Sequence, residues 1–108
     1  MLILVCLDRA RLGLPNDGSS DFPFAAQAAY ASVYPAVQNL MLAAHGLGLG
    51  TVLTTLHLPA EREIKMLLGI PAHVQSVALV PVGHPRRKHG PPQRILAAER
   101  THWDRWTR

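Results

Sequence analysis

Charged side chains are scarce in this sequence, and one long internal stretch has none. They make up 17% of the 108 residues, against about 25% in typical soluble proteins. No Asp, Glu, Lys or Arg occurs between Phe22 and Ala60. Hydrophobic residues reach 48%, which excludes a disordered tail because such segments contain few apolar side chains. The scarcity of charge is unusual in a short chain, since short chains have the most surface to cover.

A disulfide framework is excluded because Cys6 is the single cysteine. This fits a reducing compartment, and we expect a cytoplasmic protein. The opening residues 1–7 are apolar but contain no basic residue, so they predict a strand rather than a signal peptide. Gln38, Asn39 and His45 interrupt the best membrane window of the charge-free stretch. We therefore expect no membrane partner.

Two strands are predicted from continuous apolar runs. Residues 2–7 predict a strand buried on both faces, with Cys6 as a small core residue. Residues 74–82 predict a second buried strand, in which Pro81 marks the end or a bulge. Between them, residues 51–56 are β-branched and predict either a short strand or an extended loop.

A helix before this short segment is predicted by apolar residues at helical spacing from Tyr30 to Ala44. Ser32 is the expected N-cap, so that Pro35 falls in the first turn and Gly46 follows the last one. The opposite face carries small or uncharged side chains (Ala36, Gln38, Asn39, Leu42 and Ala43). Because such a face is normally covered, we expect it to pack against another surface.

A second helix is expected to open at Pro59 and to end at Gly69. Glu61 and Glu63 lie favourably near its N-terminus, and an apolar stripe follows (Ile64, Leu67 and Leu68). The resulting order of strand, helix, short strand, helix and strand is an α/β (α+β) arrangement.

The glycines of Gly46–Gly50 are spaced G-x-G-x-G. A dinucleotide fingerprint needs G-x-G-x-x-G after a strand and before a helix, and here the glycines follow a helix instead. Two other interpretations stay open. The glycines either form the turn that ends the helix, or let the backbone of residues 51–56 approach a flat ligand closely.

No constellation of side chains typical of metal binding or nucleophilic catalysis is present. The six histidines form neither H-E-x-x-H nor a Cys/His zinc pattern. No Ser/His/Asp or Cys/His arrangement is recognisable. We therefore predict neither a metal ligand nor a catalytic side chain.

The net charge of +4 comes from the C-terminal arm, residues 83–108. This arm holds most of the basic residues of the chain (Arg86, Arg87, Lys88, Arg94, Arg100, Arg105 and Arg108). It has three interpretations: a solvated terminus, a nucleic-acid-binding segment with Trp103 and Trp106 as stacking groups, or a clamp for a cofactor phosphate. Composition alone does not choose among them.

Five stretches, taken in order, resemble the FMN-dependent nitroreductase family. The first runs from Tyr34 to Thr51 and contains Q-N-L-M-L-A-A and G-L-G-L-G. It is followed by T-T-L-H, L-L-G-I-P and V-A-L-V-P-V-G-H-P, and by R-I-L-A-A-E-R-T-H-W-D-R-W (Thr54–His57, Leu67–Pro71, Val77–Pro85 and Arg94–Trp106). The resemblance covers about residues 1–106.

The resemblance implies that residues 1–108 are the C-terminal part of a nitroreductase-like domain. Its sheet with flanking helices is incomplete, because the N-terminal half of the family is absent. It also implies FMN and NAD(P)H as cofactors, a homodimer partner and a small-molecule electron acceptor, without nucleic acid. The residues matched to the flavin ring are Leu53, Thr54, Thr55 and Leu56, whose N–H groups lie near the reactive ring nitrogen. Arg94 matches the basic residue that meets the FMN phosphate.

The expected function is therefore an NAD(P)H oxidoreductase that reduces nitroaromatic or quinone-like acceptors by hydride transfer through the flavin. In such enzymes the flavin carries out the chemistry, and the protein supplies binding and orientation. A truncated, non-catalytic remnant or dimerisation module of the same fold is the alternative. A nucleic-acid binder that uses the basic arm is a third hypothesis.

Overall fold

The structure is a computed structural model that describes residues 1–14, 23–87 and 90–106. Lys88 and Arg108 of the arm lie outside these ranges. The elements occur in the predicted order, and their bounds are β1 (Leu2–Asp8), α1 (Pro23–Gly46), β2 (Gly50–Thr51), α2 (Glu61–Leu68) and β3 (Val74–Gly83). Short 3-10 turns cover Ala10–Leu12, Leu58–Ala60 and Ala97–Arg100.

The strands form one antiparallel sheet in the order β1-β3-β2. β1 pairs with β3 from Leu2 opposite Pro81 to Asp8 opposite Val74, with a bulge between Val5 and Cys6. Pro81 therefore lies near the end of the central strand, as predicted, and the bulge lies elsewhere. The expected fold class is confirmed as a mixed helix and sheet arrangement.

Helix α1 begins earlier than predicted. It starts at Pro23, so Ser32 is not the N-cap and Pro35 lies inside the helix. The Ser32 hydroxyl donates to the Ala28 carbonyl one turn back, at 3.2 Å, which is a common arrangement for serine within a helix. Alanine-rich sequence before Ser32 favours the helix, and packing on the sheet offsets the hydrogen bond that Pro35 cannot make.

The C-terminus of α1 is closed by Gly48 rather than by Gly46, which is the last helical residue. Gly48 has a φ of 77°, a conformation that glycine adopts at little cost. Its N–H donates to the His45 carbonyl, and the Leu49 N–H donates to the Ala44 carbonyl, both at 2.9 Å. This pair of bonds is the Schellman arrangement. The first open interpretation of the glycine motif, a helix-ending turn, is therefore confirmed.

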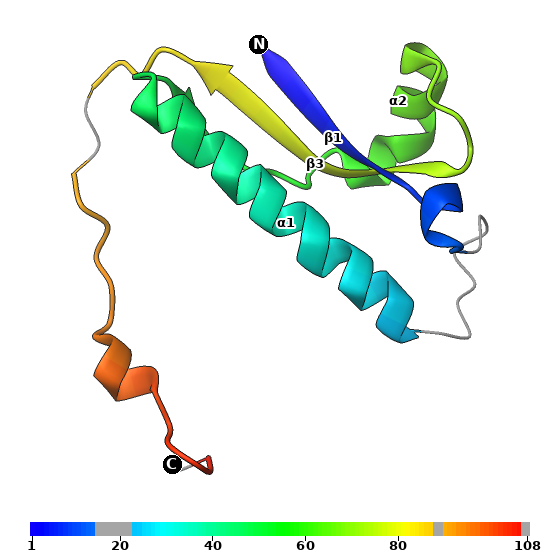
Figure 1. The fold of residues 1–108 in the computed structure, drawn as a ribbon. Helices are drawn as coiled ribbons and strands as arrows, with labels where there is room; N and C mark the ends of the chain where they lie inside the picture. Colours follow the sequence, from blue (N-terminus) through cyan, green and yellow to red (C-terminus); the bar gives the residue numbers. More distant parts are fainter. Residues whose placement is uncertain (15–22, 88–89, 107–108) are drawn as a thin grey trace.

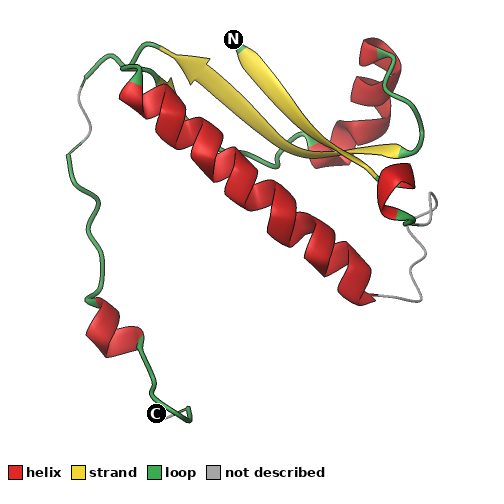
Figure 2. Cartoon of the chain, viewed as in Figure 1, coloured by secondary structure: helices red, strands yellow, loops and turns green. Residues whose placement is uncertain are grey.

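One face of the sheet is covered by α1, which lies along it in Figure 2. Val37 packs there on Ala78, Val80 and Val82 and is only 1% exposed. A second cluster joins the far end of α1 to β1 (Leu7, Leu14, Ala29 and Val77). The predicted apolar stripe of α1 is thus the core-facing stripe. Its opposite face is exposed in this chain, and the expected covering surface stays a prediction.

The other face of the sheet is only partly covered, so the prediction that β1 is buried on both faces is wrong for this chain. Leu2 is 67% exposed, and Leu4 and Leu79 are half-buried. Cys6 is exposed rather than a core residue. Helix α2 packs only at one end of this face, and its expected apolar stripe leaves Leu67 and Leu68 exposed.

The arm leaves the sheet after β3 and extends away from the two helices (Figure 1). From residue 90 to 106, every described residue except His102 is exposed. The His102 and Trp106 rings stack at a centroid distance of 4.2 Å. The radius of gyration of 17.6 Å exceeds the roughly 13 Å of a compact chain of this length, because the arm lies apart from the core.

Candidate functional site

The segment Leu53–Leu56 lies beside β3, directly after the glycine-rich turn and β2. Thr54 exchanges both backbone hydrogen bonds with Leu79, at 2.9 Å each. The side chain of Leu53 packs against the core around Val37. Of residues 51–56, only Thr51 lies in a strand, and the others form a loop that the Thr54 bridge ties to β3. The extended loop is therefore the better of the two predicted alternatives.

Pairing with β3 determines which backbone donors of this segment are free. The Thr54 N–H is used in the sheet, and the Leu56 N–H donates to the Thr54 hydroxyl at 3.2 Å. Residues flanking a paired residue direct their N–H groups to the opposite side. Within the described ranges, the N–H groups of Leu53 and Thr55 have no hydrogen-bond partner. These two donors are the ones available to a ligand.

The surface at the end of the segment is uncharged and open. Leu56 is 89% exposed and Thr55 is exposed. A hollow of about 570 Å³ lies before the segment, lined by Gly50, Thr51, Val52 and the end of β3 with His84 and Pro85. The segment thus offers an exposed apolar side chain, Leu56, beside the two backbone donors of Leu53 and Thr55.

Arg94 is not brought near this segment. It lies in the exposed arm, whereas Leu53–Leu56 are held against β3. The structure thus joins four of the five predicted site residues and leaves the fifth apart. The role predicted for Arg94 therefore stays a prediction.

His57, which follows the segment, was given no role in the sequence prediction. Its side chain is buried, with the residue 7% exposed. Neither ring nitrogen has a hydrogen-bond partner among the described residues. A buried polar group without a partner costs roughly 1–3 kcal/mol. The sequence marked His57 only as the last residue of T-T-L-H. That its side chain is buried became visible only in the structure.

Helix α2 is attached to the sheet by a carboxylate. One Glu61 carboxylate oxygen accepts hydrogen bonds from the Ser76 N–H at 2.7 Å and from the Ser76 hydroxyl at 3.0 Å. Ser76 is only 1% exposed and lies opposite Cys6 at the bulge. Because a bulge leaves backbone groups without ladder partners, Glu61 supplies the acceptor that the Ser76 N–H needs.

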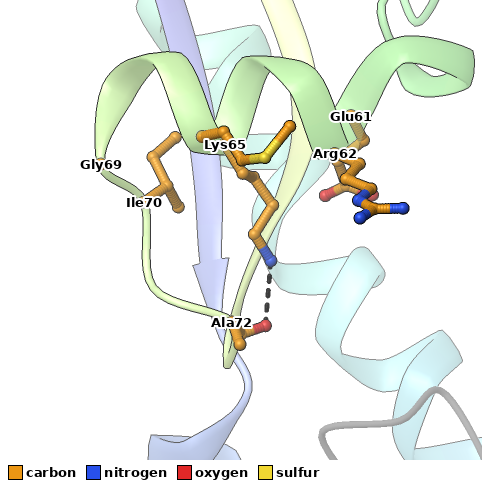
Figure 3. Close-up of a pocket in the computed structure, with 7 residues that line it drawn as sticks. Glu61, Arg62, Lys65, Gly69, Ile70 and Ala72 are labelled. Carbon is orange, nitrogen blue, oxygen red and sulfur yellow. Dashed lines mark hydrogen bonds between the residues drawn. The ribbon is translucent and has the colours of Figure 1, made fainter.

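Beside this contact lies a hollow of about 510 Å³ between α2 and the loop that follows it. Lys65 crosses the hollow and donates to the Ala72 carbonyl at 2.9 Å, while Glu61 and Arg62 lie at its other end (Figure 3). Partial burial, and then the Glu61 charge, raise the pKa of the Cys6 thiol, while Lys65 opposes this shift. The thiol therefore stays protonated to higher pH than a free cysteine.

Metal ligands do not cluster in the described parts of the chain, where no group of three or more His, Cys, Asp or Glu side chains lies together. In the same ranges, no helix is both long and apolar enough to cross a membrane.

The fold is a mixed helix and sheet arrangement in which the uncharged segment Leu53–Leu56 continues beside the central strand. The chain belongs to the Nitroreductase family, which matches residues 17–84. It is 31% identical over 106 residues to a protein of Methanothermobacter thermautotrophicus named NADH dehydrogenase/NAD(P)H nitroreductase. That match covers 96% of this chain and 49% of the relative. The predicted family resemblance is thus confirmed.

Solved structures show the same fold. The chain superposes on the NADPH:FMN oxidoreductase of Vibrio harveyi, complexed with NAD⁺, with a TM-score of 0.78 at 23% identity. Nitroreductase A of Vibrio parahaemolyticus gives a TM-score of 0.77 at 22% identity. These matches cover 99% and 98% of this chain but 47% and 45% of the solved chains. The chain therefore spans about half the length of its relatives, and the open sheet face agrees with an incomplete domain.

Proposed function

We propose that this chain is the flavin-contacting part of an FMN-dependent NAD(P)H oxidoreductase that reduces nitroaromatic or quinone-like acceptors. The observation that carries the proposal is the pair of free N–H donors on Leu53 and Thr55, beside the exposed, uncharged Leu56. The names of relatives support it, since one is an NAD(P)H nitroreductase and another an NADPH:FMN oxidoreductase.

The residues of this chain would bind and orient the flavin rather than react. When bound, FMN supplies the hydride chemistry. The Leu53 and Thr55 N–H groups would donate to acceptor atoms of the ring, and backbone donors of this kind stabilise charge that develops there during reduction. Leu56 would cover apolar ring atoms and exclude water. Arg94 would neutralise the FMN phosphate, as a guanidinium does well.

The proposal includes a homodimer acting in the cytoplasm. Two features support a second copy: the uncharged outer face of α1, where Leu42 is 58% exposed, and the arm that carries Arg94 away from its own site segment. Sedimentation velocity of the purified chain, with and without FMN, tests this assembly. A monomer under both conditions contradicts it.

The function itself is tested by titrating FMN with the purified 108-residue chain and following quenching of flavin fluorescence. We expect saturable binding, a flavin that remains bound during gel filtration, and NAD(P)H oxidation with a quinone or nitroaromatic acceptor. Absence of saturable binding contradicts the proposal for this chain.

A non-catalytic module that pairs through its apolar surfaces is the second candidate. The partly open sheet face around Leu2, Leu4 and Leu79 favours it, because that face needs a covering surface whether or not a flavin binds. The two candidates differ in turnover: the module forms a stable assembly without oxidising NAD(P)H, whereas the enzyme does both.

A further inference from the structure

The buried histidine next to the proposed flavin segment has a hydrogen-bonding capacity that the described structure leaves unused. Both His57 ring nitrogens are shielded from water and have no partner in the described residues. Whatever its protonation state, an imidazole carries at least one N–H donor. Buried side-chain polar atoms are nearly always paired in folded proteins, so the missing partner itself requires an explanation.

The position of His57 indicates where that partner comes from. The Leu58 N–H donates to the Thr55 carbonyl at 3.0 Å, and the Ala60 N–H donates to the His57 carbonyl at 3.0 Å. Thr55 and His57 therefore lie within the same pair of hydrogen-bonded turns. Any ligand that draws the Thr55 N–H toward it acts directly on the turn that holds the His57 ring.

We propose that His57 is a flavin-binding residue, whose imidazole N–H donates a hydrogen bond to an acceptor atom of the bound flavin ring. This inference rests on the proposed function. Both nitrogens are buried in the described structure, so this contact requires the turn from Thr55 to Ala60 to move and uncover the ring. His57 then supplies a side-chain donor beside the backbone donors of Leu53 and Thr55.

The test compares FMN affinity and flavin-free stability in matched variants. His57→Phe keeps a ring of similar shape without nitrogens, and His57→Gln keeps an N–H donor. His45→Phe changes an exposed histidine near the end of α1 and is the control. We expect about a ten-fold rise in the Kd for FMN in H57F, the factor that corresponds to roughly 1.4 kcal/mol, with partial recovery in H57Q and no change in H45F.

The melting temperature without flavin separates binding from a merely structural role. Since the ring nitrogens have no partner to lose among the described residues, H57F should melt no lower than the wild type. A fall in this melting temperature that accounts for the loss of FMN affinity overturns the proposal. The proposal is also overturned if the wild type binds FMN and H57F binds it with the same Kd. That result would place the partner of His57 in polypeptide outside the described residues.

Nitrogen-15 NMR of the histidine-labelled wild type gives a second measurement that needs no variant. We expect a His57 ring N–H signal to move to a hydrogen-bonded position and become protected from exchange when FMN is added. A His57 signal unchanged by saturating FMN overturns the inference alone. A wild type that does not bind FMN contradicts the proposed function first, and the inference with it.

Discussion

Replacing Glu61 by alanine tests how α2 is held to the sheet. The variant removes the acceptor of two hydrogen bonds from Ser76, and it leaves a buried N–H at the bulge without a partner. A hydrogen bond to a charged group contributes about 1.5–3 kcal/mol. Because Glu61 is only half-buried and water can replace part of the loss, we expect the free energy of unfolding to fall by about 2–3 kcal/mol.

The assay is urea unfolding followed by far-UV circular dichroism. Tryptophan fluorescence is unsuitable, because Trp103 and Trp106 both lie exposed in the arm and do not report on the core. Glu63→Ala is the control, since Glu63 is an exposed carboxylate in the same first turn of α2. Losing its favourable interaction with the helix N-terminus should cost only about 0.3–1 kcal/mol.

Glu61→Gln keeps one acceptor oxygen and should recover part of the loss. The denaturant slope should stay the same in all variants, because the surface exposed on unfolding does not change. If E61A is destabilised no more than E63A, the carboxylate does not hold α2, and the assigned role of the Ser76 contact is wrong.

Three further predictions concern single positions. Thr55→Pro removes a free backbone donor and should raise the Kd for FMN about ten-fold, whereas Thr55→Ala keeps the N–H and should change it little; equal effects contradict the donor role. Gly48→Ala forces a side chain into a left-handed conformation and should lower stability by about 1 kcal/mol, while Gly46→Ala in the helix should raise it by about 0.5–1 kcal/mol, as measured by urea unfolding. At pH 8, iodoacetamide should alkylate Cys6 more slowly than free cysteine, because its raised pKa lowers the thiolate fraction. Glu61→Gln should speed this reaction, and an unchanged rate contradicts the electrostatic cause.

Much of the fold could be predicted from the sequence because its signals are local. Strands β1 and β3 were predicted from apolar runs, and the core-facing stripe of α1 was predicted from helical spacing. The start of α1 was misplaced because Ser32 and Pro35 are typical of a helix N-terminus. In the structure, alanine-rich sequence and packing on the sheet override those local preferences.

Burial was the property that sequence predicted least well. An apolar run such as β1 indicates a strand that is covered on both faces. It does not indicate whether this chain itself supplies both covering layers. Cys6 was therefore placed in a core that the described chain does not complete. The site segment was located through family motifs, whereas the choice of free donors depended on the pairing of Thr54 with Leu79, which no sequence pattern specified.

The position of β1 at the edge of the sheet has a consequence for how this chain behaves in solution. One side of β1 is bonded to β3. Among the described residues the other side has no strand partner, so it presents N–H and C=O groups along an apolar strand without proline or lysine. Natural proteins protect such edges, because they template pairing with other chains. We expect the purified 108-residue chain to associate with itself through this edge at high protein concentration, unless another surface covers it.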